Sequence, residues 1–160
     1  MAIAAALTAL LLAAGCGSDD DSATGSSDGE VTVETGSLSK AKFVEQANAI
    51  CQKTKDQFNK EAAQFVEQVS KKPPKPTEGS PEEKLVEKAV VPNYQNEVDE
   101  ISALGAPSGD EKEVTAFLEA LQQVVDGASE EPASFVQSGG SFGKAPKLAK
   151  AYGLSGCAEL

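Results

Sequence analysis

One run of apolar side chains limits the fold of this 160-residue chain more than any other feature. Between residues 43 and 69 apolar or small side chains recur every three or four positions, which places them on one face of a helix. The sequence therefore predicts a long amphipathic helix, with Ser39 as its N-cap and an end before the proline-rich segment 71–76. The stripe consists of Phe43, Ala47, Ile50, Thr54, Phe58, Ala62, Phe65 and Val69.

A second helical pattern follows the proline-rich segment. Residues 80–83, Ser-Pro-Glu-Glu, have the spacing of a capping box with proline in the first helical position. An apolar face then continues to Ile101. Pro92 lies inside this segment, and we expect a kink or a new helix start between residues 89 and 92.

The rest of the chain is also predicted to be helical. Residues 108–111, Ser-Gly-Asp-Glu, indicate a second capping box, and the helix behind it is expected to end at Gly127. A short turn of helix and a glycine-rich loop come next, before a last helix at residues 146–152. The predicted fold is therefore all-α, a small up-down bundle of about four helices over residues 38–160.

Composition excludes several classes of function. The net charge is -11, every one of the 14 basic residues is lysine, and histidine is absent. A chain without a clustered cationic surface is a poor candidate for nucleic acid. Without histidine it has no imidazole ligand for a metal and no base that titrates near neutrality. We therefore expect no nucleic-acid partner, no metal and no cofactor.

The amino-terminal segment has the features of an export signal. Residues 1–15 carry no charge and would reach roughly 22 Å as a helix, too short for a bilayer core of about 30 Å. Residues 13–16, Ala-Ala-Gly-Cys, resemble the lipobox of bacterial lipoproteins. That resemblance implies that residues 1–15 are a signal peptide, and that Cys16 carries lipid on the outer face of the cell membrane. An ordinary secretory signal is the alternative.

Residues 16–37 are expected to be a lipidated cysteine followed by a flexible acidic tether. The segment after Cys16 contains six acids, no lysine and many glycine and serine residues, so it cannot bury enough apolar surface to fold. Residues 19–30 resemble a calcium-binding loop only in part, because Thr24 occupies the position that needs glycine. A solvated linker is the favoured interpretation.

Three cysteines are an odd number for an exported chain. If Cys16 is acylated, Cys51 and Cys157 remain outside the reducing cytoplasm and are expected to form a disulfide. Two separate, redox-active thiols are the alternative. The segment around Cys51, with Ala-Tyr-Gly-Leu-Ser-Gly-Cys at 151–157, resembles small exported or lipid-anchored helical proteins of actinobacteria. This resemblance implies that the chain is exported and that the two cysteines form a disulfide. It implies no activity.

No catalytic residues are predicted. The Ser-x-x-Lys spacing occurs at residues 37–40 and 141–144, which is close to the number expected by chance, and no companion motif accompanies it. Glu97, Asp99 and Glu100 are near one another on a helix, and we expect them to face water. The chain is therefore not expected to be an enzyme.

Two functions are compatible with these observations. The first is a lipid-anchored extracytoplasmic module that binds a protein partner without catalysis. The alternative is a carrier that holds a small apolar ligand within the bundle, where aromatic side chains would line a cavity. A filled core favours the first and a large internal cavity favours the second. The aromatic residues concerned are Phe43, Phe58, Phe65, Tyr94 and Phe117.

Overall fold

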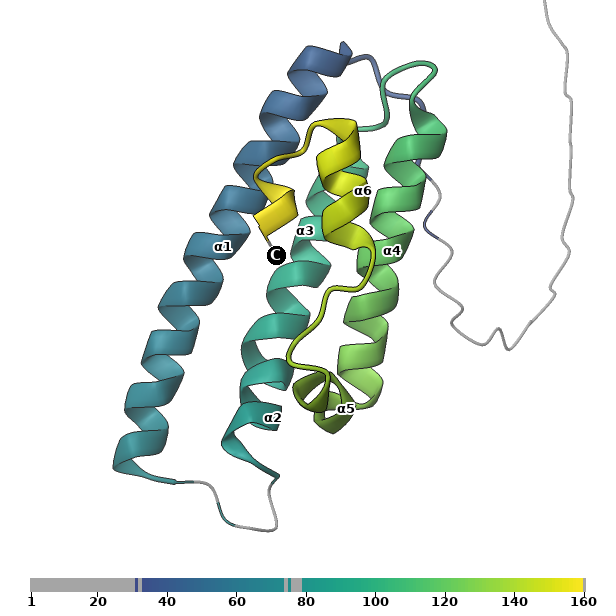
Figure 1. Cartoon of the computed structure of the whole chain (residues 1–160). Helices are drawn as coiled ribbons and strands as arrows, with labels where there is room; N and C mark the ends of the chain where they lie inside the picture. Colours follow the sequence, from purple (N-terminus) through teal and green to yellow (C-terminus); the bar gives the residue numbers. More distant parts are fainter. Residues whose placement is uncertain (1–30, 32, 74, 76–78, 160) are drawn as a thin grey trace, which may run out of the picture.

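The computed structural model describes residue 31 and residues 33–73, 75 and 79–159. Apart from one isolated β-bridge, the regular elements of its described part are all helices, which confirms the predicted all-α bundle (Figure 1). The described residues include no helix that combines the length and the apolar character needed to span a bilayer. The signal segment, Cys16 and the tether up to residue 30 lie outside the described residues.

Helix α1, Lys40–Lys71, begins as predicted. The Ser39 hydroxyl accepts a hydrogen bond from the Lys42 amide at 3.4 Å. The predicted apolar stripe is buried only in the first half of the helix, at Phe43, Ala47 and Thr54, and Cys51 beside it is buried as well. In the second half the stripe is only partly covered, so this end of α1 retains apolar surface.

The second predicted helix consists of three consecutive segments. These are α2, Pro81–Leu85, the π-helical turn η2, Val86–Val90, and α3, Val91–Ala103. The capping box at its start is confirmed, with Ser80 and Glu83 bonded to each other's amides. The predicted new start before Pro92 is also confirmed. Proline has no amide to donate, and the wider π-turn accommodates the interrupted ladder of hydrogen bonds.

Helix α4, Glu111–Glu130, differs from its prediction at both ends. The capping box at 108–111 is wrong, because Asp110 is the N-cap residue and its carboxylate accepts a hydrogen bond from Tyr152 Oη at 2.8 Å instead. The predicted end at Gly127 is also wrong. The helix continues for three more residues, since Ala128 behind the glycine is buried in the core.

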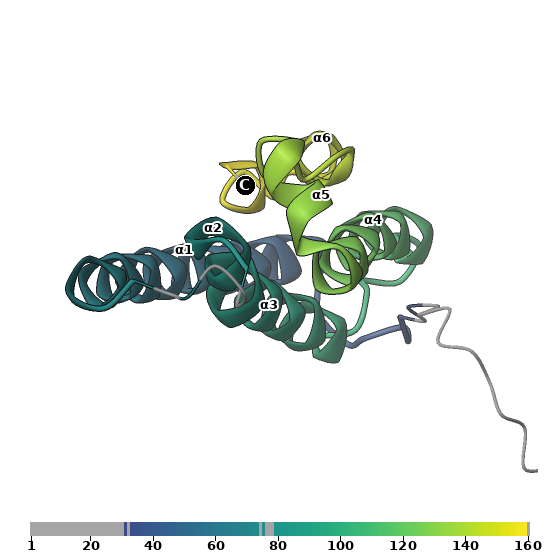
Figure 2. The same ribbon diagram turned by 90° about the horizontal axis from the view of Figure 1, so that it is seen from below.

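The carboxyl-terminal part of the chain covers one face of the longer helices. It contains α5, Pro132–Gln137, α6, Ala145–Tyr152, and a 3₁₀ turn η3, Cys157–Glu159. Helix α6 ends as predicted at Gly153, which has a φ of 102°. Seen along the bundle, α1, α3 and α4 form one layer, and α5, α6 and the carboxyl terminus form a second (Figure 2).

The described end of the segment before α1 also contacts the bundle. The Ala106 amide donates to the Glu34 carbonyl at 2.9 Å, and the Gly36 amide donates to the Ala106 carbonyl at 2.7 Å. Gly36 and Gly105 cross so closely that a Cβ on Gly36 would lie 2.7 Å from the Gly105 oxygen. Ordered structure in the described residues therefore begins before residue 38.

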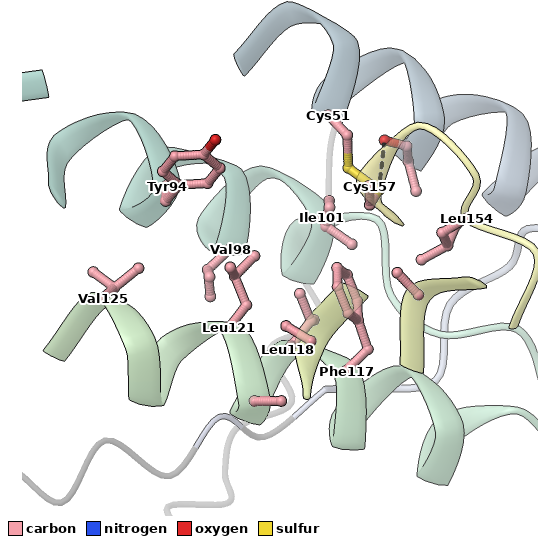
Figure 3. Packing of buried hydrophobic residues seen from close by; sticks show 14 of the residues in the cluster. Cys51, Tyr94, Val98, Ile101, Phe117, Leu118, Leu121, Val125, Leu154 and Cys157 are labelled. Carbon is pink, nitrogen blue, oxygen red and sulfur yellow. Dashed lines mark hydrogen bonds between the residues drawn. A yellow bond between two sulfur atoms is a disulfide. The ribbon is translucent and has the colours of Figure 1, made fainter. Parts of the chain in front are cut away.

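The core between the two layers is filled by side chains from all the longer helices. Phe43 from α1, Ile101 from α3, and Phe117 and Leu118 from α4 are all 0% exposed. Leu154, after α6, closes the same cluster (Figure 3). Two of the aromatic residues that a ligand cavity would need, Phe43 and Phe117, are thus packed in the core.

Candidate functional site

The two predicted partner cysteines meet between the first and last elements of the domain. Cys51 on α1 and Cys157 on η3 form a disulfide with a Cα–Cα distance of 5.1 Å (Figure 3). Both residues are buried. The bond joins positions 106 residues apart, so it ties the carboxyl terminus to the start of the fold.

Few other contacts hold the terminal turn in place. The Gly156 amide donates to Asn48 Oδ1 at 2.7 Å, and exposed Lys55 pairs with Glu159 at 2.6 Å. A Cβ on Gly156 would lie 3.1 Å from the Asn48 carbonyl oxygen, so a larger residue would push the turn away from α1. The turn is therefore a short clasp, which we define as residues 154–159, held by Leu154, these two contacts and the disulfide.

A buried carboxyl group lies against this disulfide. Glu97 on α3 is 1% exposed, and its Oε1 lies 3.4 Å from Cys51 Sγ. A disulfide sulfur carries no hydrogen, so this contact is not a hydrogen bond while the bond is closed. The other oxygen, Oε2, has no hydrogen-bond partner among the described residues. The carboxyl group is thus poorly satisfied in a site where water is excluded.

The burial of Glu97 corrects the prediction that the acidic cluster faces water. Asp99 is exposed, and Glu100 forms an ion pair with Lys53 at 2.6 Å, so those two residues do face solvent. Glu97 lies three residues after Tyr94 and four before Ile101, both on the apolar face of α3. That spacing was the signal that could have identified it.

Burial changes the acid–base behaviour of this site. Removal from water raises the pKa of Glu97 to about 7, and a hydrogen bond from Thr54 opposes this by a smaller amount. Burial, together with the nearby Glu97, raises the pKa of Tyr94 to about 12. Near neutral pH, Glu97 can therefore both hold and release a proton beside Cys51. Histidine commonly has this role in proteins, and this chain contains no histidine.

The same residues do not form a metal site in the disulfide form. One potential ligand atom each from Cys51, Glu97 and Cys157 lies within 4.8 Å of the others. Because the two sulfurs are bonded to each other, neither is a thiolate. In the disulfide form, the carboxylate of Glu97 is therefore the single group of this cluster that could bind a cation.

The two serine–lysine pairs are not organised for catalysis. Ser37 and Lys40 are both exposed, and Lys40 instead forms an ion pair with Asp110 at 3.2 Å. Ser141 accepts a hydrogen bond from the Gly143 amide at 3.2 Å. Among the described contacts, no hydrogen bond joins a serine to the lysine three residues later.

A second feature is an open groove between the second half of α1 and the helix that begins at α2. Its volume is about 460 Å³, and it is open to solvent. Half-buried Phe65 and Val69 continue the α1 stripe into it, and one turn of α2 and η2 faces them. The lining residues are Phe65, Gln68, Val69, Lys72, Pro73, Lys84 and Lys88.

The groove is basic in a strongly acidic chain. Lys84 pairs with Glu87 at 2.7 Å, whereas Lys72 and Lys88 form no ion pair with a carboxylate of the described residues. Among the described residues that line the groove, none is acidic. An apolar floor and a lysine rim are thus combined at this end of the bundle, and sequence reasoning missed it because it depends on how α1 and α2 are placed.

No family model, no curated protein and no solved structure matches this chain. The fold and the two sites described above are therefore interpreted from their own geometry.

Proposed function

We propose that this chain is a lipid-anchored extracytoplasmic binding module that performs no catalysis and holds a protein partner in the groove between α1 and α2. The anchor is the expected lipid on Cys16. The observation that carries the binding role is the second half of α1, whose apolar stripe leaves the core and enters an open groove edged by lysines. An apolar helix face left partly uncovered is characteristic of interaction surfaces.

The position of the groove supports a partner away from the anchor. The segment leading from the tether joins the bundle at Ala106, beside the start of α1 (Figure 1). The groove lies at the other end of α1. A helix of 32 residues is about 48 Å long, so an anchored molecule would carry the groove at the end opposite its tether.

The lining of the groove indicates the chemistry of the partner. Phe65 and Val69 provide an apolar surface for one or two hydrophobic side chains. Lys72, Lys84 and Lys88 favour carboxylates beside them, and such rim charges act mainly on recognition and association rate. The proposed partner segment is therefore a short acidic stretch of another protein that contains a large apolar side chain. No comparable observation favours a carrier with a ligand inside the core.

Site-specific photo-crosslinking in intact cells tests this function. A photoreactive residue at Gln68, inside the groove, is expected to attach to a protein segment that contains Asp or Glu next to an apolar residue. The matched control is Gln52, which is exposed and lies on about the opposite face of α1. Mass spectrometry of the crosslinked peptide identifies the attached segment.

The lysines provide the second arm of this experiment. Replacing Lys72, Lys84 and Lys88 together by Gln should abolish the adduct at Gln68, because the partner's carboxylates lose their counter-charges. Equal adducts at Gln52 and Gln68, an adduct that survives the triple substitution, or attachment to lipid alone would contradict the proposed function.

A further inference from the structure

We propose that Glu97 is the proton donor and acceptor for Cys51, so that the Cys51–Cys157 disulfide is a reducible closure of the clasp at residues 154–159. The structural basis is a single contact, the 3.4 Å between Glu97 Oε1 and Cys51 Sγ, inside a sealed site. Neither the fold nor the groove requires a carboxyl group at this position. An apolar residue would fill the space without leaving an unpaired oxygen.

The contact becomes a hydrogen bond only when the disulfide opens. In the closed form Cys51 Sγ has no hydrogen, and Glu97 Oε2 has no partner. In the open form Cys51 carries a thiol, whose hydrogen points at an acceptor already within hydrogen-bonding distance for sulfur. Glu97 therefore stabilises the dithiol form relative to the disulfide.

Glu97 also determines which sulfur leaves. A thiolate of a reducing dithiol attacks Cys157 Sγ, the Cys51–Cys157 bond breaks, and its electron pair goes to Cys51 Sγ. Protonated Glu97 then transfers its proton to Cys51, which leaves as a neutral thiol. The second thiol of the reductant loses its proton to water and attacks the reductant's own sulfur in the mixed disulfide. Cys157 leaves as a thiolate, which takes a proton from water, and the reductant is left as a cyclic disulfide. In the reverse direction the Glu97 carboxylate removes the proton from Cys51, which generates the attacking thiolate.

The surroundings of Glu97 suit this role. The titratable groups that face it are Tyr94 on its own helix, Cys51 on α1 and Cys157 on η3. Thr54 provides a neutral hydroxyl, and the ion pairs Lys53–Glu100 and Lys55–Glu159, which join α1 to α3 and to η3, are at the surface. Since no lysine of the described residues is buried beside Glu97 to hold it as a carboxylate, Glu97 can carry the proton at neutral pH.

The clasp is built to open. Leu154 anchors the clasp in the core, and the disulfide ties Cys157 to α1. Beyond these, the clasp is held to α1 by the Gly156 amide, which donates to Asn48 Oδ1, and by one exposed ion pair between Glu159 and Lys55. A short terminal segment with so few polar contacts can fray locally without unfolding of the domain. Fraying exposes Cys157 Sγ, which is 0% exposed in the structure, to an external dithiol, and full opening follows reduction.

Reduction kinetics of the full chain test the proposal. The chain is treated with excess dithiothreitol in the presence of a chelator, quenched by alkylation, and the reduced fraction of Cys51 and Cys157 is measured by peptide mass spectrometry. At pH 6 we expect the wild type to be reduced at least tenfold faster than Glu97→Gln, because the variant has no proton to give. At pH 8.5 the ratio of the two rates should approach one. Because both chains are treated at the same pH, the ratio of their rates does not depend on how much of the reductant is ionised.

Glu100→Gln is the matched control, because it removes an exposed carboxylate from the same helix. It should be reduced at the wild-type rate. Loss of stability alone would make Glu97→Gln open more often and react faster, which is the opposite direction. A wild-type to Glu97→Gln ratio below tenfold at pH 6, or one that is the same at pH 6 and pH 8.5, overturns the proposal.

Discussion

At the scale of single residues, Glu97 is the position where local sequence and tertiary structure conflict. A glutamate belongs on a solvated helix face, yet this one occupies the apolar face between Tyr94 and Ile101. Burying a carboxyl group without a full set of partners is costly, and the usual response is to keep it protonated. That response makes the stability of the domain depend on pH.

We predict that the contribution of Glu97 to the free energy of unfolding falls by about 3 kcal/mol as the pH rises from 4.5 to 7. The pKa of Glu97 is about 7 in the folded chain against an ordinary value of 4.5, so the folded state binds more protons between these values. Each pH unit in that window is worth about 1.4 kcal/mol. Urea unfolding of wild type and Glu97→Gln at pH 4.5, 6 and 8 measures the difference. The stability of the wild type relative to Glu97→Gln should be highest at pH 4.5, lower at pH 6 and lowest at pH 8; a difference that does not vary with pH would refute the raised pKa.

The same residue shows where sequence reasoning about the site reached its limit. The disulfide was predictable, because the expected acylation of Cys16 left Cys51 and Cys157 as the remaining pair of cysteines. Glu97 was missed although its spacing was visible, because consecutive acids on a helix usually face water. The groove was beyond prediction, since it depends on the angle between α1 and α2 and not on any local pattern.

At the scale of the elements, most helices follow from local signals. Ser39, the capping box at Ser80 and Glu83, Pro92 and Gly153 all act on their nearest neighbours, and each boundary that they predict is confirmed. The predictions for both ends of α4 were wrong, because tertiary contacts determine these ends. Asp110 is engaged by Tyr152 and Lys40, and the burial of Ala128 extends the helix past Gly127. Contacts between distant segments override a local cap or break.

We predict that Gly127→Ala stabilises the domain by up to about 1 kcal/mol. Gly127 lies inside α4, and no atom would lie within 4 Å of an added Cβ. Alanine loses less backbone entropy than glycine on entering a helix. Thermal and urea unfolding of the two chains under the same conditions measure the effect.

Gly156→Ala is the matched comparison for that experiment. Its Cβ would lie 3.1 Å from the Asn48 carbonyl oxygen, so it should lower stability instead. A Gly127→Ala chain that unfolds earlier than the wild type would show that α4 ends nearer to Gly127 than described.

At the scale of the whole molecule, the two ends of the bundle differ. The end at Ala106 contacts the segment that precedes α1, and the other end carries the basic groove. The charge blocks follow the same division of the chain. Residues 40–72 carry a net charge of +3, whereas residues 78–131 carry -11, so the groove joins a basic helix to the start of an acidic region. Each surface ion pair contributes little to stability, but together these charges determine the electrostatic potential around the groove.

We predict that Cys16→Ser releases the chain from the membrane, because the only expected attachment is the lipid on that residue. Stable anchoring needs at least two acyl chains, and mass spectrometry of the wild type extracted from membranes should find them on Cys16. The control is a chain with both Cys51 and Cys157 replaced by Ser, which should stay membrane-bound. A Cys16→Ser chain that fractionates with the membrane as the wild type does would contradict the anchor.

The crossing of Gly36 over Gly105 has a mechanical consequence for an anchored molecule. A load applied through the tether reaches the loop at Ala106 before it reaches α1. It is carried there by two short backbone hydrogen bonds and by the Thr35 hydroxyl, which donates to Glu111 at 2.9 Å. Once these bonds part, residues 33–37 can straighten toward an extended length of at most about 3.3 Å per residue. In an anchored molecule, these contacts would therefore break before tension on the amino-terminal segment is transmitted to the helices that form the groove.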